Sequence, residues 1–159
     1  MITNYAKYNN NVYKLDMDGD ILELMSEDPA DLENGFSFYV DVLGKKHNDF
    51  FIKRVKTEDL DLAYNIKVNV IYKGEEFETL SLGPFNNQEG TVSLFTNDYV
   101  VAKKFDFYKQ EQFVFVKEVP LQEIESLIEI HIPILDFREL PTSRKVIKRT
   151  EIKNYLKKL

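Results

Sequence analysis

The chain has 159 residues, enough for one domain of ordinary size, and its 43% hydrophobic content with 12 Phe and 9 Tyr argues against disorder. The net charge of −6 disfavours nucleic acid and anionic membranes as partners, because both would be repelled at long range. The absence of cysteine excludes disulfides and thiolate metal sites, and no apolar run approaches the roughly 18 residues that a membrane span needs. We therefore expect a single globular domain, residues 1–159, without a signal peptide and in the cytoplasm.

The first strands are predicted in pairs. Val12 to Met17 and Ile21 to Met25 alternate apolar and polar residues and are joined across Asp18-Gly19, and Asp-Gly between such runs is a strong hairpin signal. Residues 26–35 read as a polar connection with room for one helical turn after Pro29. Residues 36–44 and 49–55 predict a second strand pair around the turn "GKKHN".

The clearest hairpin lies in the middle of the chain, over residues 62–83. Alternate residues from Ile66 to Tyr72 are apolar, residues 73–75 form the turn, and the return strand alternates again. Residues 83–90 have the composition of a loop, and residues 91–95 predict a further short strand. Residues 96–105 predict a short helix with Thr96 or Asn97 as its N-cap.

The last third is expected to contain most of the helix. A strand over residues 111–120 ends at Pro120, and residues 120–130 then place proline at the start of a short amphipathic helix. Residues 131–141 hold two prolines and are extended or irregular, and an amphipathic helix is expected from Thr142 onward. The prediction is an α+β fold, with an antiparallel sheet of hairpins in the first two-thirds and short helices and a C-terminal amphipathic helix packing on it.

Asp16 and Asp18 are the strongest candidates for catalytic chemistry. Asp-x-Asp-Gly after a strand resembles the motif of haloacid-dehalogenase-type phosphatases, in which the first Asp attacks phosphorus and the second handles the leaving-group proton. In this chain Asp20 replaces the Thr of that motif, and no βα crossover follows to build the parallel sheet. A calcium loop fits no better, because Ile21 falls where glycine is needed. We interpret the stretch as a hairpin turn, with a small Asp-dependent hydrolase or phosphatase as an alternative.

Other catalytic or metal-binding patterns are scarce. The two histidines, His47 and His131, lie far apart in the sequence, and each is more often a surface or core residue than a ligand. The sequence contains no P-loop, dinucleotide fingerprint, nucleophile elbow or His-Glu-x-x-His motif. We therefore expect a protein that is not an enzyme, with no catalytic residues, no metal site and no cofactor.

Acidic clusters are the feature that points to a partner. An acidic surface attracts a basic protein, although a solvated surface that keeps the chain soluble is an equally good explanation. The basic stretch after Thr142 is better explained by a solvated terminal helix than by nucleic-acid binding. The residues expected to contact a partner are Asp28, Asp31, Glu33, Glu75, Glu76 and Glu78.

One segment resembles a known group of proteins. Residues 96–127, "TNDYVVAKKFDFYKQEQFVFVKEVPLQEIESL", are similar to the later part of small bacterial immunity proteins from polymorphic toxin systems. The resemblance implies a short helix, a Lys- and aromatic-rich turn, a strand and a helix in succession. It also implies a non-enzymatic module that neutralises a co-encoded toxin, here a basic toxin domain, by direct binding and occlusion. The alternative is a phage or mobile-element structural protein that self-assembles, and the sequence leaves the oligomeric state open.

Overall fold

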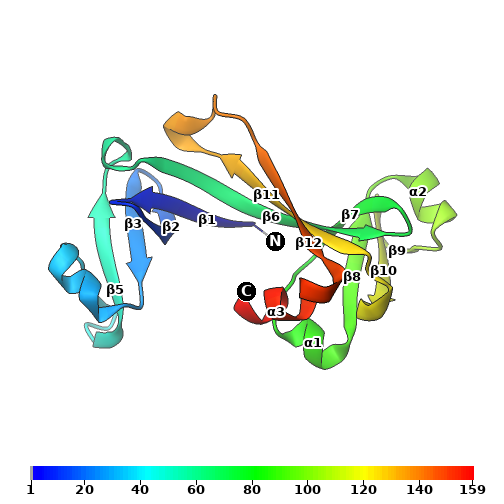
Figure 1. Ribbon diagram of the computed structural model, residues 1–159, viewed down its shortest axis with the longest axis horizontal. Coiled ribbons are helices and arrows are strands. Elements are labelled where there is room, and N and C mark those ends of the chain that lie inside the picture. The colour runs from blue at the N-terminus through cyan, green and yellow to red at the C-terminus, as the bar shows by residue number, and fades with distance from the viewer. Residues whose placement is uncertain (1) are drawn as a thin grey trace. The chain divides into compact units, whose positions relative to one another are not determined.

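The computed structural model describes residues 2–159 and shows an α+β fold dominated by antiparallel sheet (Figure 1). The chain divides into two compact units. The N-terminal unit comprises Thr3–Ile66 and Ile132–Thr142, and the C-terminal unit consists mainly of Lys67–His131 and Ser143–Leu159. The expectation of one globular domain stays a prediction. None of the helices within residues 2–159 has the length and apolar character to span a bilayer.

The strands of the N-terminal unit lie in the order β4-β5-β3-β2-β1-β6, coloured blue to green in Figure 1, and neighbouring strands from β4 to β1 are antiparallel. Short 3₁₀ helices connect or flank them: η1 (Pro29–Asn34), η2 (Thr57–Asp59) and η4 (Leu135–Phe137). The strands are β1 (Ile2–Tyr8), β2 (Asn11–Asp18), β3 (Ile21–Ser26), β4 (Ser37–Val40), β5 (Lys46–Val55) and the first part of β6 (Leu62–Tyr72).

The turns of this unit confirm the hairpin predicted across Asp18-Gly19 and reveal a strand that the sequence did not suggest. Asp18 pairs with Ile21, and Gly19 between them has a φ of +59°, a conformation that glycine adopts without steric cost. β1 precedes this hairpin and pairs with β2 across Asn9 and Asn10, which both have positive φ. Asparagine tolerates this backbone conformation better than most residues, so the two-residue turn has a local explanation.

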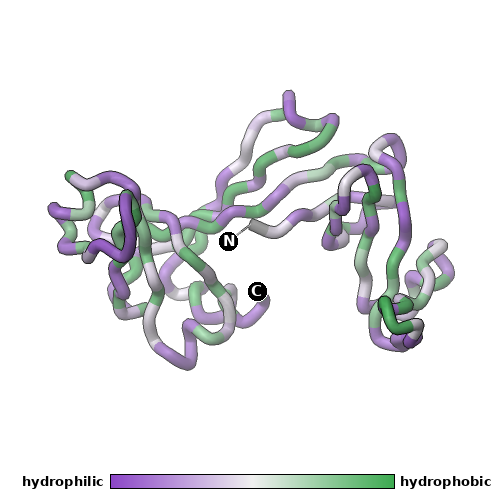
Figure 2. The backbone as a smooth tube through the Cα atoms, turned by 180° about the vertical axis from the view of Figure 1, so that it is seen from behind, coloured by the Kyte–Doolittle hydropathy of each residue, from purple (hydrophilic) through white to green (hydrophobic). Residues whose placement is uncertain are grey.

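The core of the N-terminal unit follows from strand alternation. Leu22 and Leu24 on β3 are buried, and Leu15 on β2 and Phe51 on β5 lie in the same hydrophobic cluster. Side chains two residues apart point to the same face of a sheet, so each strand contributes alternate residues to this cluster. Figure 2 shows the resulting bands of hydrophobic and hydrophilic residues along the tube.

The C-terminal unit continues β6 from Lys67 and has the strand order β6-β7-β8-β10-β9, with β11 pairing both β6 and β12. Its helical elements are α1 (Phe85–Glu89), α2 (Tyr99–Lys104), η3 (Leu121–Glu123), η5 (Arg149–Glu151) and α3 (Ile152–Lys158). Its remaining strands are β7 (Glu75–Thr79), β8 (Thr91–Thr96), β9 (Tyr108–Glu111), β10 (Val114–Pro120), β11 (Ser126–Pro133) and β12 (Ser143–Lys148).

The core of the C-terminal unit joins this sheet to its terminal helix. Val70, Leu94 and Val119 are fully buried, and α3 contributes the buried residues Ile152 and Leu156. The Asn87 side chain donates a hydrogen bond of 2.9 Å to the Lys153 carbonyl, which ties α1 to α3. A C-terminal helix is therefore confirmed, but it begins at Ile152 rather than Thr142.

The prediction of an amphipathic helix over residues 120–130 is wrong. One 3₁₀ turn follows Pro120, and Ser126–Pro133 then forms a strand that pairs with β12, with Leu127 opposite Ile147 and Ile128 opposite Val146. Leu127 and Ile128 point to opposite faces and are both buried. A buried strand with apolar residues on both faces has no distinctive period, so its pattern also fits a short helix. The same pairing turns residues 143–148 into strand where a helix was expected.

The loop predicted over residues 83–90 contains the helix α1. Asn86, which is 2% exposed, accepts a hydrogen bond from the Gly83 amide at 2.8 Å and donates one to the Thr91 carbonyl at 2.9 Å. Gly90, with a φ of +73°, ends the helix as a left-handed C-cap residue. The helix is thus stabilised by one buried side chain, whose partners composition alone does not reveal.

Candidate functional site

A hollow of about 420 Å³ in the C-terminal unit contains three of the six predicted contact residues. β7 forms one side of it, and the end of β8 with the start of α2 forms the other. We call it the acidic hollow, and its lining residues are Glu75, Glu76, Phe77, Glu78, Phe95, Thr96, Asn97, Asp98 and Val101.

Strand alternation places Glu76 and Glu78 on the open face of β7, and Glu75 is exposed as the first residue of the strand. Lys73 and Gly74 both have positive φ and form the tight turn from β6, which sets the register that pairs Val70 with Phe77 and Ile71 with Glu76. Phe77 and Thr79 are buried, whereas Glu76 and Glu78 lie on the opposite face. The predicted hairpin is confirmed.

Asp98 adds a carboxylate that the sequence prediction missed. Its side chain is the N-cap of α2 and accepts hydrogen bonds from the amides of Val100 at 2.8 Å and Val101 at 3.2 Å. The predicted caps, Thr96 and Asn97, are therefore wrong by one or two residues. A signal for Asp98 was present, since aspartate is a preferred N-cap residue, but its place beside β7 depends on pairing between distant strands.

The charges of the hollow are only partly compensated. Lys67 forms an ion pair with Glu78, and Arg144 forms one with Glu76. Glu75 is exposed, and its side chain makes no hydrogen bond or ion pair with residues 2–159. Four carboxylates against two cations leave the hollow with a net charge of −2.

Glu76 accepts two side-chain hydrogen bonds, from Asn69 and Arg144. Its burial tends to raise the pKa of the carboxyl, but hydrogen bonds from Asn69, at 2.9 Å, and from Arg144 outweigh this effect and lower the pKa below its usual value. A general acid needs a raised carboxyl pKa, so the shift runs in the direction opposite to acid catalysis. Within residues 2–159, no cluster of three His, Cys, Asp or Glu side chains could hold a metal ion.

The chemistry of the hollow suits a cationic side chain. Phe95 and Val101 offer partly exposed apolar surface beside the carboxylates. Lysine and arginine bury their aliphatic stems on such surface and keep the charged group at a polar edge. The hollow can therefore accept a basic side chain from a protein.

The other predicted acidic contacts lie in the N-terminal unit and differ sharply in exposure. Asp28 is an exposed N-cap of η1 and accepts a hydrogen bond from the Ala30 amide at 3.0 Å, and Glu33 is exposed. Asp31 is only 7% exposed. Its carboxylate accepts hydrogen bonds from the Tyr13 hydroxyl at 2.8 Å, the Ser26 hydroxyl at 2.5 Å and the Asn34 amide at 3.0 Å. Asp31 thus anchors η1 to β2 and β3.

The hydrogen bonds of this anchor shift the pKa values of the Asp31 carboxyl and the Tyr13 hydroxyl. Burial tends to raise the pKa of the Asp31 carboxyl, but the hydrogen bonds from Ser26, Asn34 and Tyr13 together lower it. Burial, together with the hydrogen bond to the Asp31 carboxylate, raises the pKa of Tyr13 to about 12. Asp28 and Asp31 line a hollow of about 500 Å³ that Tyr13 and Ser26 also border.

The remaining candidates do not form a common site. Asp16 pairs with Glu23 and Asp18 with Ile21 on an antiparallel hairpin, where both aspartates are exposed, rather than at the end of a parallel strand. His47 contacts Asp41 in the N-terminal unit, and His131 contacts Glu129 in the C-terminal unit.

Comparison with known proteins shows one family. A family described as Uncharacterised conserved protein UCP033725 matches residues 2–134 of this chain. The chain belongs to this family. The matched region includes every residue of the acidic hollow and the Asp31 anchor, but it ends before β12 and α3. No curated protein and no solved structure matches the chain.

Proposed function

We propose that this protein is a non-enzymatic protein-binding module, an immunity-type inhibitor that binds a co-encoded basic toxin through the acidic hollow. The observation that carries the proposal is the open carboxylate set of the hollow: net charge −2, with Glu75 free of partners within residues 2–159, next to the partly exposed Phe95. The module acts in the cytoplasm and blocks the toxin by covering its working surface.

The mechanism rests on two separable contributions. The unpaired carboxylates raise the rate of encounter with a positively charged surface, an effect that salt screens. A lysine or arginine of the toxin then enters the hollow, where its aliphatic stem packs on Phe95 and Val101. Asp28 and Glu33 are exposed and are secondary contacts. Asp31 is buried and hydrogen-bonded, so we do not include it among the contacts.

The test is binding to the purified product of the adjacent gene, measured by calorimetry or by surface-based kinetics. We expect a one-to-one complex that weakens as salt rises. Glu75→Lys should weaken the complex about 10- to 100-fold, because it places a cation in a site that recognises one. Glu33→Lys makes the same charge change on an exposed residue of the other unit and should have a much smaller effect.

Two outcomes contradict the proposal. One is the absence of a complex with a toxin that is shown to be folded. The other is a complex whose affinity is insensitive to Glu75→Lys, because the acidic hollow would then lie outside the interface.

A further inference from the structure

The turn between β4 and β5 exposes two aliphatic side chains almost completely. Val42 is 99% exposed and Leu43 is 90% exposed, the two highest values among the exposed large hydrophobic residues. Two exposed lysines, Lys45 and Lys46, follow them. We call these four residues the basic apolar tip. An exposed leucine is unremarkable when it lies in a mobile coil, so the rigidity of the turn decides whether the tip has meaning.

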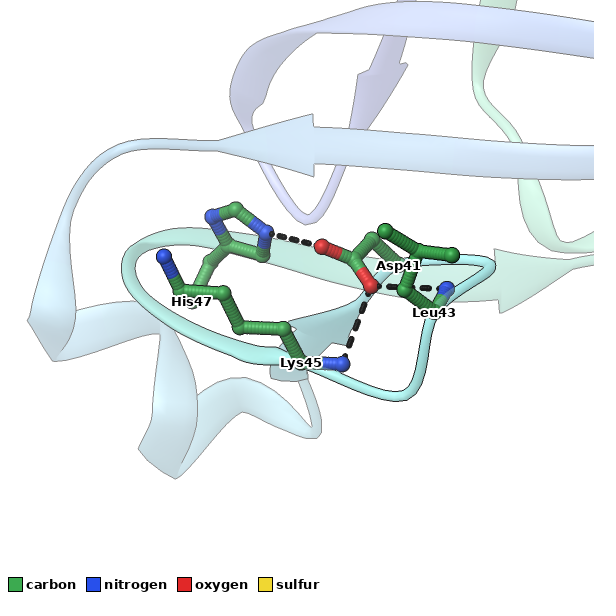
Figure 3. A network of polar contacts seen from close by, with 4 residues as sticks. All are labelled: Asp41, Leu43, Lys45 and His47. Carbon is green, nitrogen blue, oxygen red and sulfur yellow. Dashed lines mark hydrogen bonds and ion pairs between the residues drawn. The ribbon is translucent and has the colours of Figure 1, made fainter.

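The turn is held by one aspartate. The Asp41 carboxylate accepts hydrogen bonds of 2.9 Å from the amides of Leu43 and Lys45 through one oxygen, and its other oxygen lies 2.9 Å from Nε2 of His47 (Figure 3). The Asp41 amide donates to the Lys45 carbonyl at 3.0 Å, and the Gly44 amide donates to the Asp41 carbonyl at 2.9 Å. Gly44, with a φ of +82°, allows the backbone to close. The tip is therefore preorganised.

A preorganised apolar tip favours binding. While Val42 and Leu43 remain exposed to water, they contribute no burial free energy to folding. Each contributes burial free energy to a complex when a partner covers it. Because the backbone is already ordered, association loses less conformational entropy than it would with a flexible loop. The flanking lysines select the partner, since they require an acidic rim around whatever apolar surface receives Val42 and Leu43.

The chain itself carries such a surface. The acidic hollow has a net charge of −2, and the two lysines of the tip together with Asp41 have a net charge of +1. Its partly exposed Phe95 and Val101 provide apolar contact for the tip, and its volume of about 420 Å³ lies in the range of sites that bury small ligands. We infer that the basic apolar tip of one copy docks into the acidic hollow of a second copy.

This contact goes beyond the proposed toxin binding and has a defined symmetry. The tip and the hollow are different surfaces, so the contact is head-to-tail. Repeated contacts of this kind generate closed rings, of which a reciprocal pair is the smallest, or open chains. The contact also occupies the hollow, so the self-associated protein and a toxin-bound protein exclude each other. The interface is small and belongs to the weak, transient class.

The experiment is sedimentation equilibrium of the purified full chain, without toxin, from ~10 μM to ~1 mM, a range that covers weak transient contacts. We expect the mean mass of the wild-type protein to rise with concentration and to fall back as salt is added. Leu43→Asp should weaken association at least ~10-fold, the scale of losing one buried leucine from an interface. Glu75→Lys should do the same from the other side, because it brings the charge of the hollow to zero.

Mixing these two variants provides the decisive arm. The Leu43→Asp protein keeps an intact hollow, and the Glu75→Lys protein keeps an intact tip. Each variant alone should therefore associate at least ~10-fold more weakly than the wild type, whereas their mixture should form a one-to-one dimer with wild-type affinity that cannot grow. Leu140→Asp is the matched control, because Leu140 is 50% exposed in the same unit but lies outside the tip, and it should associate as the wild type does. Circular dichroism of each variant verifies that it is folded.

Three results overturn the inference. A wild-type protein that remains monomeric up to ~1 mM does so directly, since weak contacts are populated at that concentration. An unchanged association of the Leu43→Asp protein excludes the tip, and the absence of a dimer in the variant mixture excludes the pairing of tip and hollow. None of these results involves a toxin, so they leave the proposed function to its own test.

Discussion

The Asp31 cluster of the N-terminal unit and the acidic hollow of the C-terminal unit contain the same kinds of side chain but use them in opposite ways. Asp31 is buried and accepts three side-chain hydrogen bonds, so its carboxylate is already satisfied by partners within the fold. Glu75 is exposed, and no partner for it exists among residues 2–159. A carboxylate without internal partners is available for binding, whereas a buried and satisfied one stabilises the fold. Net charge alone does not distinguish the two.

The largest effect is expected for Asp31→Ala. The substitution leaves the buried hydroxyls of Tyr13 and Ser26 without their acceptor, and it also removes the acceptor of the exposed Asn34 amide. Leaving buried donors unsatisfied should lower the free energy of unfolding by about 2–4 kcal/mol. Urea unfolding at pH 7 measures it. Glu33→Ala, an exposed neighbour on η1, should change the value by less than about 0.5 kcal/mol, and equal effects of the two substitutions would contradict the anchoring role.

The hydrogen bond between Tyr13 and Asp31 can be tested by the dependence of stability on alkaline pH. The pKa of Tyr13 in the folded protein is raised to about 12, so its neutral form stabilises the fold fully below the unfolded pKa of about 10. As pH rises from about 10 to about 12, the unfolded chain loses this proton first, and about 2–3 kcal/mol of stability should disappear. Tyr13→Phe should remove that part of the alkaline loss in denaturant titrations at each pH. Tyr108→Phe, at an exposed tyrosine, should retain the wild-type loss.

Glu76 is the intermediate case and tests whether the hollow contributes to stability at all. It accepts hydrogen bonds from Asn69 and Arg144, which lower its pKa despite burial, but its side chain remains 32% exposed. Glu76→Ala should cost about 0.5–1 kcal/mol at pH 7, the scale of a half-exposed pair. The stabilisation exists above the usual carboxyl pKa and is lost as pH falls through the lowered value, so the wild type and the variant should converge in acid. A cost as large as that of Asp31→Ala would remove the contrast between the two regions.

The features that the sequence predicted are the local ones. Asp18-Gly19 and Lys73-Gly74 are turn signals contained in a few adjacent residues, and both hairpins formed as expected. The failures are non-local. Nothing near Asp31 in the sequence indicates that Tyr13, 18 residues away, donates a hydrogen bond to it. The helix predicted over residues 120–130 is replaced largely by the strand β11, because β12 pairs with it. The acidic clusters could be found from composition, but their burial depends on partners that only the fold brings together.

The smallest effect is expected for Glu75→Lys, and it carries the functional side of the comparison. Glu75 is an exposed first residue of β7, and within residues 2–159 no partner loses a contact when it is replaced. The free energy of unfolding should therefore change by less than about 0.5 kcal/mol, as for other exposed positions. The same substitution should weaken both toxin binding and self-association. A large loss of stability would show instead that Glu75 supports the fold, and any loss of binding would then reflect unfolding rather than removal of a contact. A stable Glu75→Lys variant that no longer binds separates the hollow from the Asp31 anchor, where substitution lowers the stability of the fold.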